Sequence, residues 1–217
     1  KNCTLSMNLR FKNASNQLNA ANEDMEPFEY MKLLRATRKT IQNALGPEAY
    51  RRYINLINDA GMDSERYINE LLQNADDCVY ADDVKPSFVL TVSDDFSKIF
   101  TRYNEIGFTR ENVRAITSGE STKKQILVSD GKMPEIGEKG VGFKAVFAVA
   151  SKVYIHSGHF RFMLTDKAPT IPILPSDEKE PFQGTRMTFE LKKPLKKDFF
   201  TEEKVLRLCL CLRKLRY

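Results

Sequence analysis

The stretch Glu70-Leu71-Leu72-Gln73-Asn74-Ala75-Asp76-Asp77 has the periodicity of an amphipathic helix. With 3.6 residues per turn, Glu70, Asn74 and Asp77 form one polar stripe. The opposing side is apolar and consists of Ile68, Leu71, Leu72, Ala75 and Val79. A carboxamide oxygen can ligate a hard cation such as Mg²⁺, and a carboxylate one turn away can orient and deprotonate a water molecule. Taken alone, this pattern also fits an ordinary solvated helix face.

A glycine-rich loop follows about 60 residues later, and residues 136–147 read Ile-Gly-Glu-Lys-Gly-Val-Gly-Phe-Lys-Ala-Val-Phe. Glycines let backbone N–H groups approach phosphates closely, and the helix predicted after the loop adds partial positive charge at its start. Alone, such a loop also suits a plain tight turn. Together with the polar-striped helix, and in this order, it indicates a phosphate-binding site.

These two stretches resemble the N-box and the second glycine box of the GHKL ATPases, which include gyrase, the ninety-kilodalton heat-shock chaperones, histidine kinases and MutL. Residues 116–123 read Ile-Thr-Ser-Gly-Glu-Ser-Thr-Lys. With this segment included, the motifs are most similar to those of the sacsin and NO VEIN-like branch. The resemblance covers residues 63–191. It implies a Bergerat fold, which is an α/β (α+β) two-layer sandwich. In that fold a mixed, mostly antiparallel sheet is covered on one face by helices, here with an N-terminal helical extension.

The resemblance also implies roles for individual residues. Asn74 would ligate Mg²⁺, and Glu70 would act as the catalytic general base on the attacking water. Asp77 would line the pocket near the base or ribose, and Thr185 would help to hold the base. The loop and an ATP lid would supply the remaining nucleotide contacts: Ser121, Thr122, Lys123, Gly137, Lys139, Gly140, Val141, Gly142 and Phe143.

The first glycine box departs from the family pattern D-x-G-x-G. If Gly107 takes the last glycine position, Tyr103 stands where the adenine-reading Asp is expected, and Glu105 replaces the middle glycine. Asn104 is the nearest residue able to pair with the adenine amino group, although it is one position away. We therefore assign Asn104 and Gly107 to the nucleotide site, with a plain turn as the alternative for residues 104–105.

The chain divides into three predicted parts. Residues 1–62 form an arm and a helical extension, residues 63–192 the nucleotide-binding domain, and residues 193–217 the basic helical start of a following region. The extension holds one helix from Glu26 to Gly46 and another from Pro47 to Asp59. Within the domain we expect strands at 87–93, 98–103, 152–157, 160–165 and 185–191, a short helix after Thr109, and an irregular excursion at 166–183.

Composition excludes several classes of function. The 217 residues carry a net charge of +5, but nine Lys/Arg against three Asp/Glu lie in residues 192–217, so the rest is nearly neutral. This distribution disfavours nucleic acid as a partner. The four cysteines and two histidines form neither a metal-ligand spacing nor a nucleophile motif, and reduced thiols fit an intracellular protein. No apolar run approaches membrane-spanning length, and no Walker P-loop is present.

The resulting hypothesis is an ATP-binding module that closes a mobile lid over Mg-ATP and hydrolyses it slowly. It would drive conformational change in a larger chaperone-like or regulatory protein, nuclear or cytoplasmic. The family implies that a downstream domain of the same polypeptide supplies a Lys or Arg to the γ-phosphate, and a nucleotide-dependent homodimer is left open. Two alternatives remain: a nucleotide-gated or nucleotide-free interaction module (a pseudo-ATPase), which the altered first glycine box favours, and a nucleic-acid-associated ATPase.

Overall fold

The computed structural model describes residues 24–59, 66–118, 141–177, 180–210 and 212–215. Several predicted nucleotide-binding residues lie outside the described residues: Ser121, Thr122, Lys123, Gly137, Lys139 and Gly140. None of the helices in these described ranges has the length and hydrophobicity of a membrane span.

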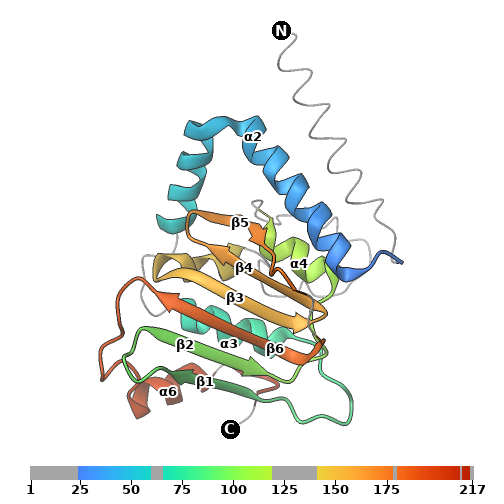
Figure 1. The fold of residues 1–217 in the computed structure, drawn as a ribbon. Helices are drawn as coiled ribbons and strands as arrows, with labels where there is room; N and C mark the ends of the chain where they lie inside the picture. The colour runs from blue at the N-terminus through green and yellow to red at the C-terminus, as the bar shows by residue number, and fades with distance from the viewer. Residues whose placement is uncertain (1–23, 60–65, 119–140, 178–179, 211, 216–217) are drawn as a thin grey trace, which may run out of the picture.

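A six-stranded sheet forms the centre of the molecule, in the order β1-β2-β6-β3-β4-β5, and every neighbouring pair is antiparallel (Figure 1). Short connections join β1 to β2 and β3 to β4 to β5, which favours antiparallel neighbours. The predicted α+β architecture is therefore confirmed, with a sheet that is antiparallel throughout. The strands are β1 (Phe88–Val92), β2 (Lys98–Tyr103), β3 (Ala150–Gly158), β4 (Phe160–Thr165), β5 (Ala168–Ile173) and β6 (Phe182–Leu191).

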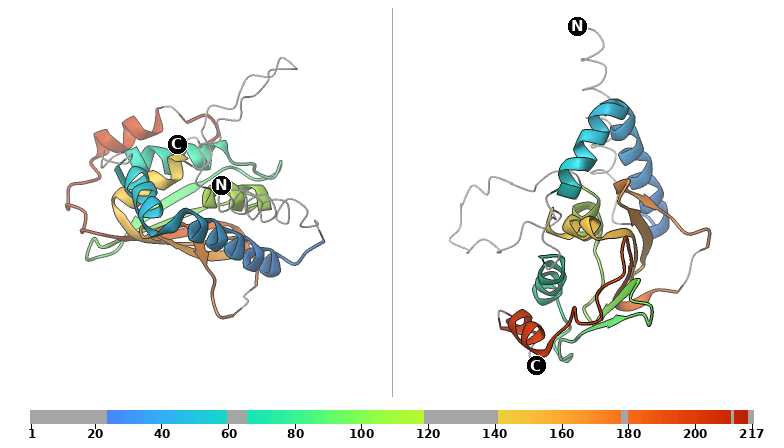
Figure 2. Two further views of the ribbon diagram at one scale, coloured as in Figure 1. Left: turned by 90° about the horizontal axis from the view of Figure 1, so that it is seen from above. Right: turned by 90° about the vertical axis from the view of Figure 1, so that its left-hand side faces the viewer.

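Helices cover one face of this sheet (Figure 2). The layer contains α3 (Arg66–Asp77), α4 (Arg110–Thr117), α5 (Val141–Lys144) with the 3-10 helix η1 (Ala145–Ala148), and α6 (Glu202–Cys209). Alternate strand residues such as Val153 and Ile155 are buried beneath them, at no more than 1% exposure. The predicted amphipathic helix is α3, although Val79 lies beyond its end and is 62% exposed, so the apolar face is shorter than predicted.

The N-terminal extension is α2 (Pro27–Asp59), which bends at Gly46, where φ is 76° and ψ is 162°. Glycine adopts this conformation, with positive φ and extended ψ, without the steric cost that other residues meet. The predicted break between two helices is therefore confirmed, and the two arms are visible in Figure 1. The second arm lies against β5, where Tyr50 and Ile54 bury Ile171.

The expectation of an irregular excursion at residues 166–183 was wrong for residues 168–173 and for residues 182–183, since β6 begins at Phe182. Residues 168–173 form β5, despite Pro169 and Pro172. Proline lacks the N–H donor of a ladder, so it is tolerated on an edge strand, and β5 is at the edge of the sheet.

The C-terminal residues fold back onto the helical layer. The carboxylate of Asp76 in α3 accepts backbone N–H hydrogen bonds from Arg213 at 2.9 Å, Lys214 at 2.7 Å and Leu215 at 2.9 Å. Residues 193–217, which we expected to begin a following region, thus pack in part against α3.

Candidate functional site

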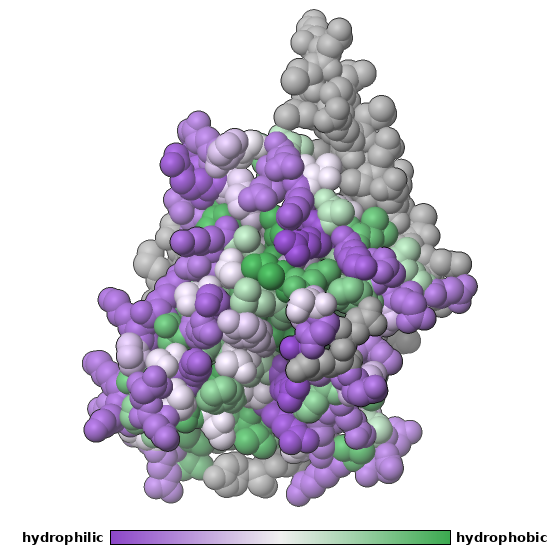
Figure 3. Space-filling model, in the orientation of Figure 1, coloured by the Kyte–Doolittle hydropathy of each residue, from purple (hydrophilic) through white to green (hydrophobic). Residues whose placement is uncertain are grey.

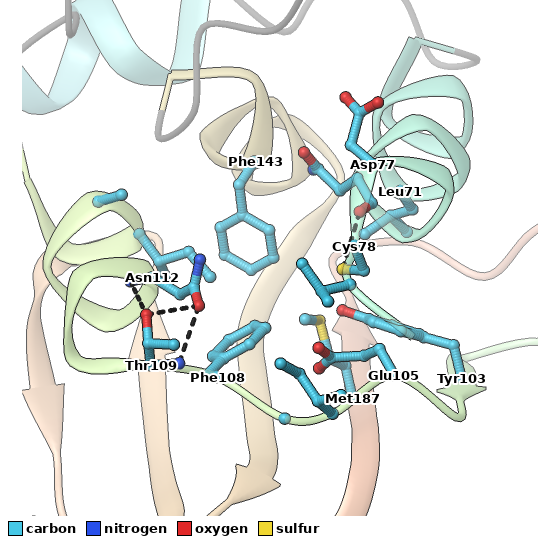
Figure 4. Close-up of a pocket in the computed structure, with 16 residues that line it drawn as sticks. Leu71, Asp77, Cys78, Tyr103, Glu105, Phe108, Thr109, Asn112, Phe143 and Met187 are labelled. Carbon is cyan, nitrogen blue, oxygen red and sulfur yellow. Dashed lines mark hydrogen bonds between the residues drawn. The ribbon is translucent and has the colours of Figure 1, made fainter. Parts of the chain in front are cut away.

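A cavity lies between the end of α3, the turn from β2 to α4, α4 itself and α5 (Figure 4). Its volume of about 140 Å³ exceeds what a single water molecule needs. The walls are largely apolar, and a few polar side chains converge on them, as is common for small-molecule sites. The lining residues are Leu71, Asn74, Asp77, Cys78, Val79, Tyr103, Glu105, Ile106, Gly107, Phe108, Thr109, Asn112, Ala115, Ile116, Phe143 and Met187.

Helix α3 supplies the carboxamide and one carboxylate of the cavity. Its apolar side, including Leu71, is buried in the core, and this orients Asn74 and Asp77 toward the opening. Asp77 also forms an ion pair with the guanidinium group of Arg213. Glu70 lies one turn earlier, is half-buried, and is not among the lining residues. The structure therefore brings two of the three stripe residues to the cavity.

Glu105 is the most deeply buried acidic group of the cavity, with 5% exposure. Its carboxylate accepts hydrogen bonds from the Thr185 hydroxyl and, at 3.4 Å, from the Ser157 hydroxyl. Burial raises the pKa of Glu105 above its ordinary value, although the hydrogen bonds from Thr185, the Gly107 N–H and Ser157 act in the opposite direction. A buried, hydrogen-bonded carboxyl therefore lies at the floor of the cavity.

Asn104 points elsewhere. Its side-chain oxygen accepts a hydrogen bond from the Ser87 N–H at 2.8 Å, and its amide nitrogen donates to the Lys85 carbonyl at 3.0 Å. Asn104 is absent from the cavity lining. Its amide thus joins the end of β2 to the segment before β1, and the neighbouring Glu105 provides the polar group on the cavity side.

Two glycines allow the backbone to approach closely around this floor. Gly107 has a φ of +94°, and a Cβ atom there would lie 3.0 Å from the Cα of Gly158. Gly184 has a φ of +92°, and its Cβ would lie 2.4 Å from the carbonyl oxygen of Tyr103. Because Gly184 permits this contact, Thr185 pairs directly with Tyr103 across β6 and β2. That register places the Thr185 hydroxyl beside Glu105.

Aromatic side chains close the apolar part of the site. Tyr103, at the predicted position of the adenine-reading Asp, is 4% exposed and stacks on Phe88 at a centroid distance of 5.9 Å. Burial raises its pKa well above the ordinary value for tyrosine. Phe143, a predicted site residue, reaches the cavity from α5 and is also 4% exposed.

A capping box holds the α4 side of the cavity in place. The Thr109 hydroxyl accepts the Asn112 backbone N–H at 3.3 Å, and the Asn112 side-chain oxygen accepts the Thr109 N–H at 2.8 Å (Figure 4). This reciprocal pair satisfies two N–H groups at the start of the helix. It confirms the predicted cap at Thr109 and fixes the lining side chains of α4.

Glu105 and Ser157 were not predicted as site residues. The sequence indicates Glu105 only as a replacement for a glycine, because a charged residue in a turn is normally exposed. Its burial depends on the hydroxyls of Ser157 and Thr185, which come from β3 and β6. The available signal was that Glu105 is a carboxylate two positions after Tyr103, which stands where the GHKL pattern has an Asp.

No protein-family model matches the chain. Part of the chain is similar to Protein NO VEIN of Arabidopsis thaliana. The two are 41% identical over 103 residues, which is 46% of this chain. The match spans only 4% of the length of NO VEIN. The similarity therefore relates this chain to a small portion of a much larger protein.

Proposed function

We propose that this chain is a nucleotide-binding module that binds Mg-ATP and hydrolyses it slowly. The observation that carries the proposal is the cavity, which brings Asn74, Asp77, Gly107 and Phe143 together from three separate segments. These are residues that the GHKL resemblance assigns to a nucleotide site. The partial similarity to NO VEIN adds support, since the sequence motifs resemble the same branch.

Recognition of the base is assigned to Glu105 instead of Asn104. The Glu105 carboxylate can accept a hydrogen bond from the amino group of adenine, while Thr185 occupies part of its remaining capacity. A site built to pair with a donor rejects analogues that lack it, because a buried polar group is then left unpaired. On this proposal, the module prefers ATP to inosine triphosphate, which lacks the amino group.

The chain offers one amide oxygen to the metal. Asn74 fits Mg²⁺ because this ion is commonly bound through one or two protein oxygens together with substrate phosphates. When bound, Mg²⁺ would neutralise charge on the phosphate oxygens. Glu70, one helical turn away, would orient and deprotonate the attacking water. Slow turnover is proposed because a γ-phosphate Lys or Arg would come from another part of a larger polypeptide.

Calorimetric titration with ATP, with and without Mg²⁺, tests the proposal on the full chain. We expect Mg²⁺-dependent binding to the native protein that Asn74→Ala abolishes. Gln73→Ala is the matched control, because Gln73 is exposed on the same helix and outside the cavity. Glu70→Ala should retain binding and lose hydrolysis, and Glu105→Gln should reverse the preference for ATP over inosine triphosphate.

Two results would overturn the proposal: no ATP binding by the native chain, or equal losses in Asn74→Ala and Gln73→Ala. The second candidate is then a nucleotide-free interaction module. The apolar walls favour it, because residues such as Ile106, Phe108 and Met187 suit a hydrophobic ligand as well as a base. The first proposal, the Mg-ATP-binding module, also includes a role in driving conformational change. The change would take place in a larger chaperone-like or regulatory protein, nuclear or cytoplasmic.

A further inference from the structure

Among the residues that the structure describes, no helix covers the face of the sheet turned away from α3 and α6, which we call the open face (Figure 2). Figure 3 views the molecule from this side, where hydrophobic and hydrophilic side chains are interspersed. Strand residues alternate between the two faces. On β2, for example, Ile99 and Thr101 are buried, whereas Phe100 and Arg102 are exposed. The open face is therefore defined by the exposed set of each strand.

Two aromatic side chains form a row across the middle of this face. Phe100 on β2 and Tyr154 on β3 pair with Thr188 of β6 from its two sides. They are thus two strand spacings apart, about 10 Å. Phe100 is 38% exposed and Tyr154 is 39% exposed. The Tyr154 hydroxyl donates a hydrogen bond to Glu190 at 3.1 Å, which helps to fix its ring.

A row of basic side chains runs parallel to the aromatic row. Arg102, Arg186 and Arg161 lie in register on β2, β6 and β4, with the buried His156 of β3 between Arg186 and Arg161, and we call the three arginines the basic row. The guanidinium groups of Arg102 and Arg186 lie 5.5 and 4.7 Å from the centre of the Phe182 ring. Arg186 also lies 3.0 Å from a ring nitrogen of His156. The row is therefore an ordered feature of the fold.

Two lysines lie on the other side of the aromatic row. Lys98 and Lys152 both pair in register with Glu190, from β2 and β3 respectively. The Lys152 ammonium group forms an ion pair with Glu190 at 3.0 Å. Cations therefore flank the aromatic row on both sides.

The basic row is only partly neutralised. Arg161 forms an ion pair with Asp177 at 3.6 Å. In the part of the chain that the structure describes, no ion pair joins Arg102 or Arg186 to a carboxylate. Like charges directly opposite each other destabilise a sheet, so an anion bound between them would relieve this repulsion.

We propose that this open sheet face binds single-stranded nucleic acid. Bases stack on Phe100 and Tyr154, and the basic row together with Lys98 holds the phosphates. Exposed aromatic side chains beside cations on a sheet surface provide the two interactions that single strands need, stacking on the bases and charge on the backbone.

The arrangement favours a single strand over an acidic peptide. A peptide rich in Asp and Glu could pair with the cations. It has no bases, however, to stack on the exposed rings of Phe100 and Tyr154, which lie between the cations. The surface lies on the opposite side of the sheet from α6 and from the α3 cavity (Figure 2). The inference is therefore independent of ATP binding.

Fluorescence anisotropy with labelled oligothymidylate and oligouridylate of about 20 nucleotides tests it on the full chain. Arg102→Ala combined with Arg186→Ala should raise the Kd about tenfold. It should also reduce the slope of log affinity against log salt by about 1.4, since each phosphate contact with a single strand contributes about 0.7. Phe100→Ala combined with Tyr154→Ala should raise the Kd about tenfold with an unchanged salt slope.

Lys196→Ala combined with Lys197→Ala is the matched control, because it removes the same charge from exposed positions outside the sheet. It should leave the Kd unchanged. Phe100→Leu combined with Tyr154→Leu retains apolar bulk without aromatic stacking and should weaken binding without unfolding the protein. Three results would overturn the inference: no binding by the native chain at low salt, equal losses in the lysine control, or tighter binding of an acidic peptide that is insensitive to both aromatic replacements.

Discussion

The carboxylate of Glu105 accepts a hydrogen bond from the hydroxyl of Thr185, which lies 80 residues further along the chain. Both side chains are buried, and they join the turn after β2 to strand β6 at the floor of the α3 cavity. The pair links the fold to the proposed site, because the same contact orients the carboxyl that we assign to base recognition.

Replacing Glu105 by Gln should change how stability depends on pH. Because the folded pKa of Glu105 is raised, the native chain loses stability as pH rises from the unfolded pKa through the folded one. Glutamine cannot ionise and still accepts the Thr185 hydroxyl, so Glu105→Gln should be at least as stable as the native chain at pH 8. Urea unfolding at pH 4 and pH 8 measures this. The exposed control Glu180→Gln should leave the pH dependence of the unfolding free energy parallel to that of the native chain. The same parallel dependence in Glu105→Gln would contradict the prediction.

The Asp76 clamp on the C-terminal residues should contribute strongly at neutral pH. Burial acts to raise the pKa of Asp76, but the N–H groups of Leu215, Arg213 and Lys214 and the charge of Arg213 outweigh it and lower the pKa. The stabilisation is present above the unfolded pKa and is lost as pH falls through the folded pKa. Asp76→Asn should therefore cost about 2 kcal/mol at pH 7 and much less at pH 3. Thermal unfolding at both values checks the prediction; an equal loss at pH 3 would refute it.

Two glycines with positive φ should respond differently to alanine. A Cβ atom at Gly46 would have no other atom within 4 Å, so Gly46→Ala meets backbone strain alone, about 2 kcal/mol. Gly184→Ala adds a contact of 2.4 Å with the Tyr103 carbonyl oxygen, and we expect a loss of about 3 kcal/mol. Urea midpoints of the two variants give the comparison. Equal losses would mean that β6 moves away from β2 at little cost.

Because of Lys144, the native chain should be more stable at alkaline pH than at neutral pH. Burial, with a smaller contribution from the charge of Arg38, lowers the pKa of this lysine to about 7. Since the unfolded state binds the extra proton between pH 7 and about 10.4, stability rises with pH across that window. Lys144→Met should lack this rise, whereas the exposed control Lys196→Met should retain it. Urea unfolding between pH 6 and pH 10 tests the difference, and a rise that persists in Lys144→Met would exclude Lys144 as its cause.

Local sequence patterns predicted most of the elements. The 3.6-residue period of residues 68–77, the break at Gly46 and the Thr109 cap depend on contacts between near neighbours, and the structure contains all three. The hairpin of β3 and β4 likewise follows from alternation around Gly158. Residues 168–173 were missed because two prolines argue against a strand, and only the position of β5 at the sheet edge makes them acceptable.

The sequence by itself determined that α3 would bury one side and present Asn74 and Asp77 on the other, since helical periodicity is a local property. Tertiary structure alone decided which polar group reaches the cavity floor. The β2–β6 register places Thr185 opposite Tyr103 and beside Glu105. Hydrogen bonds with the Ser87 N–H and the Lys85 carbonyl hold the Asn104 side chain away from the cavity. The open-face rows of aromatic and basic side chains likewise arise from strand order. Both features join residues distant in the chain, and such pairings depend on register and not on local propensity.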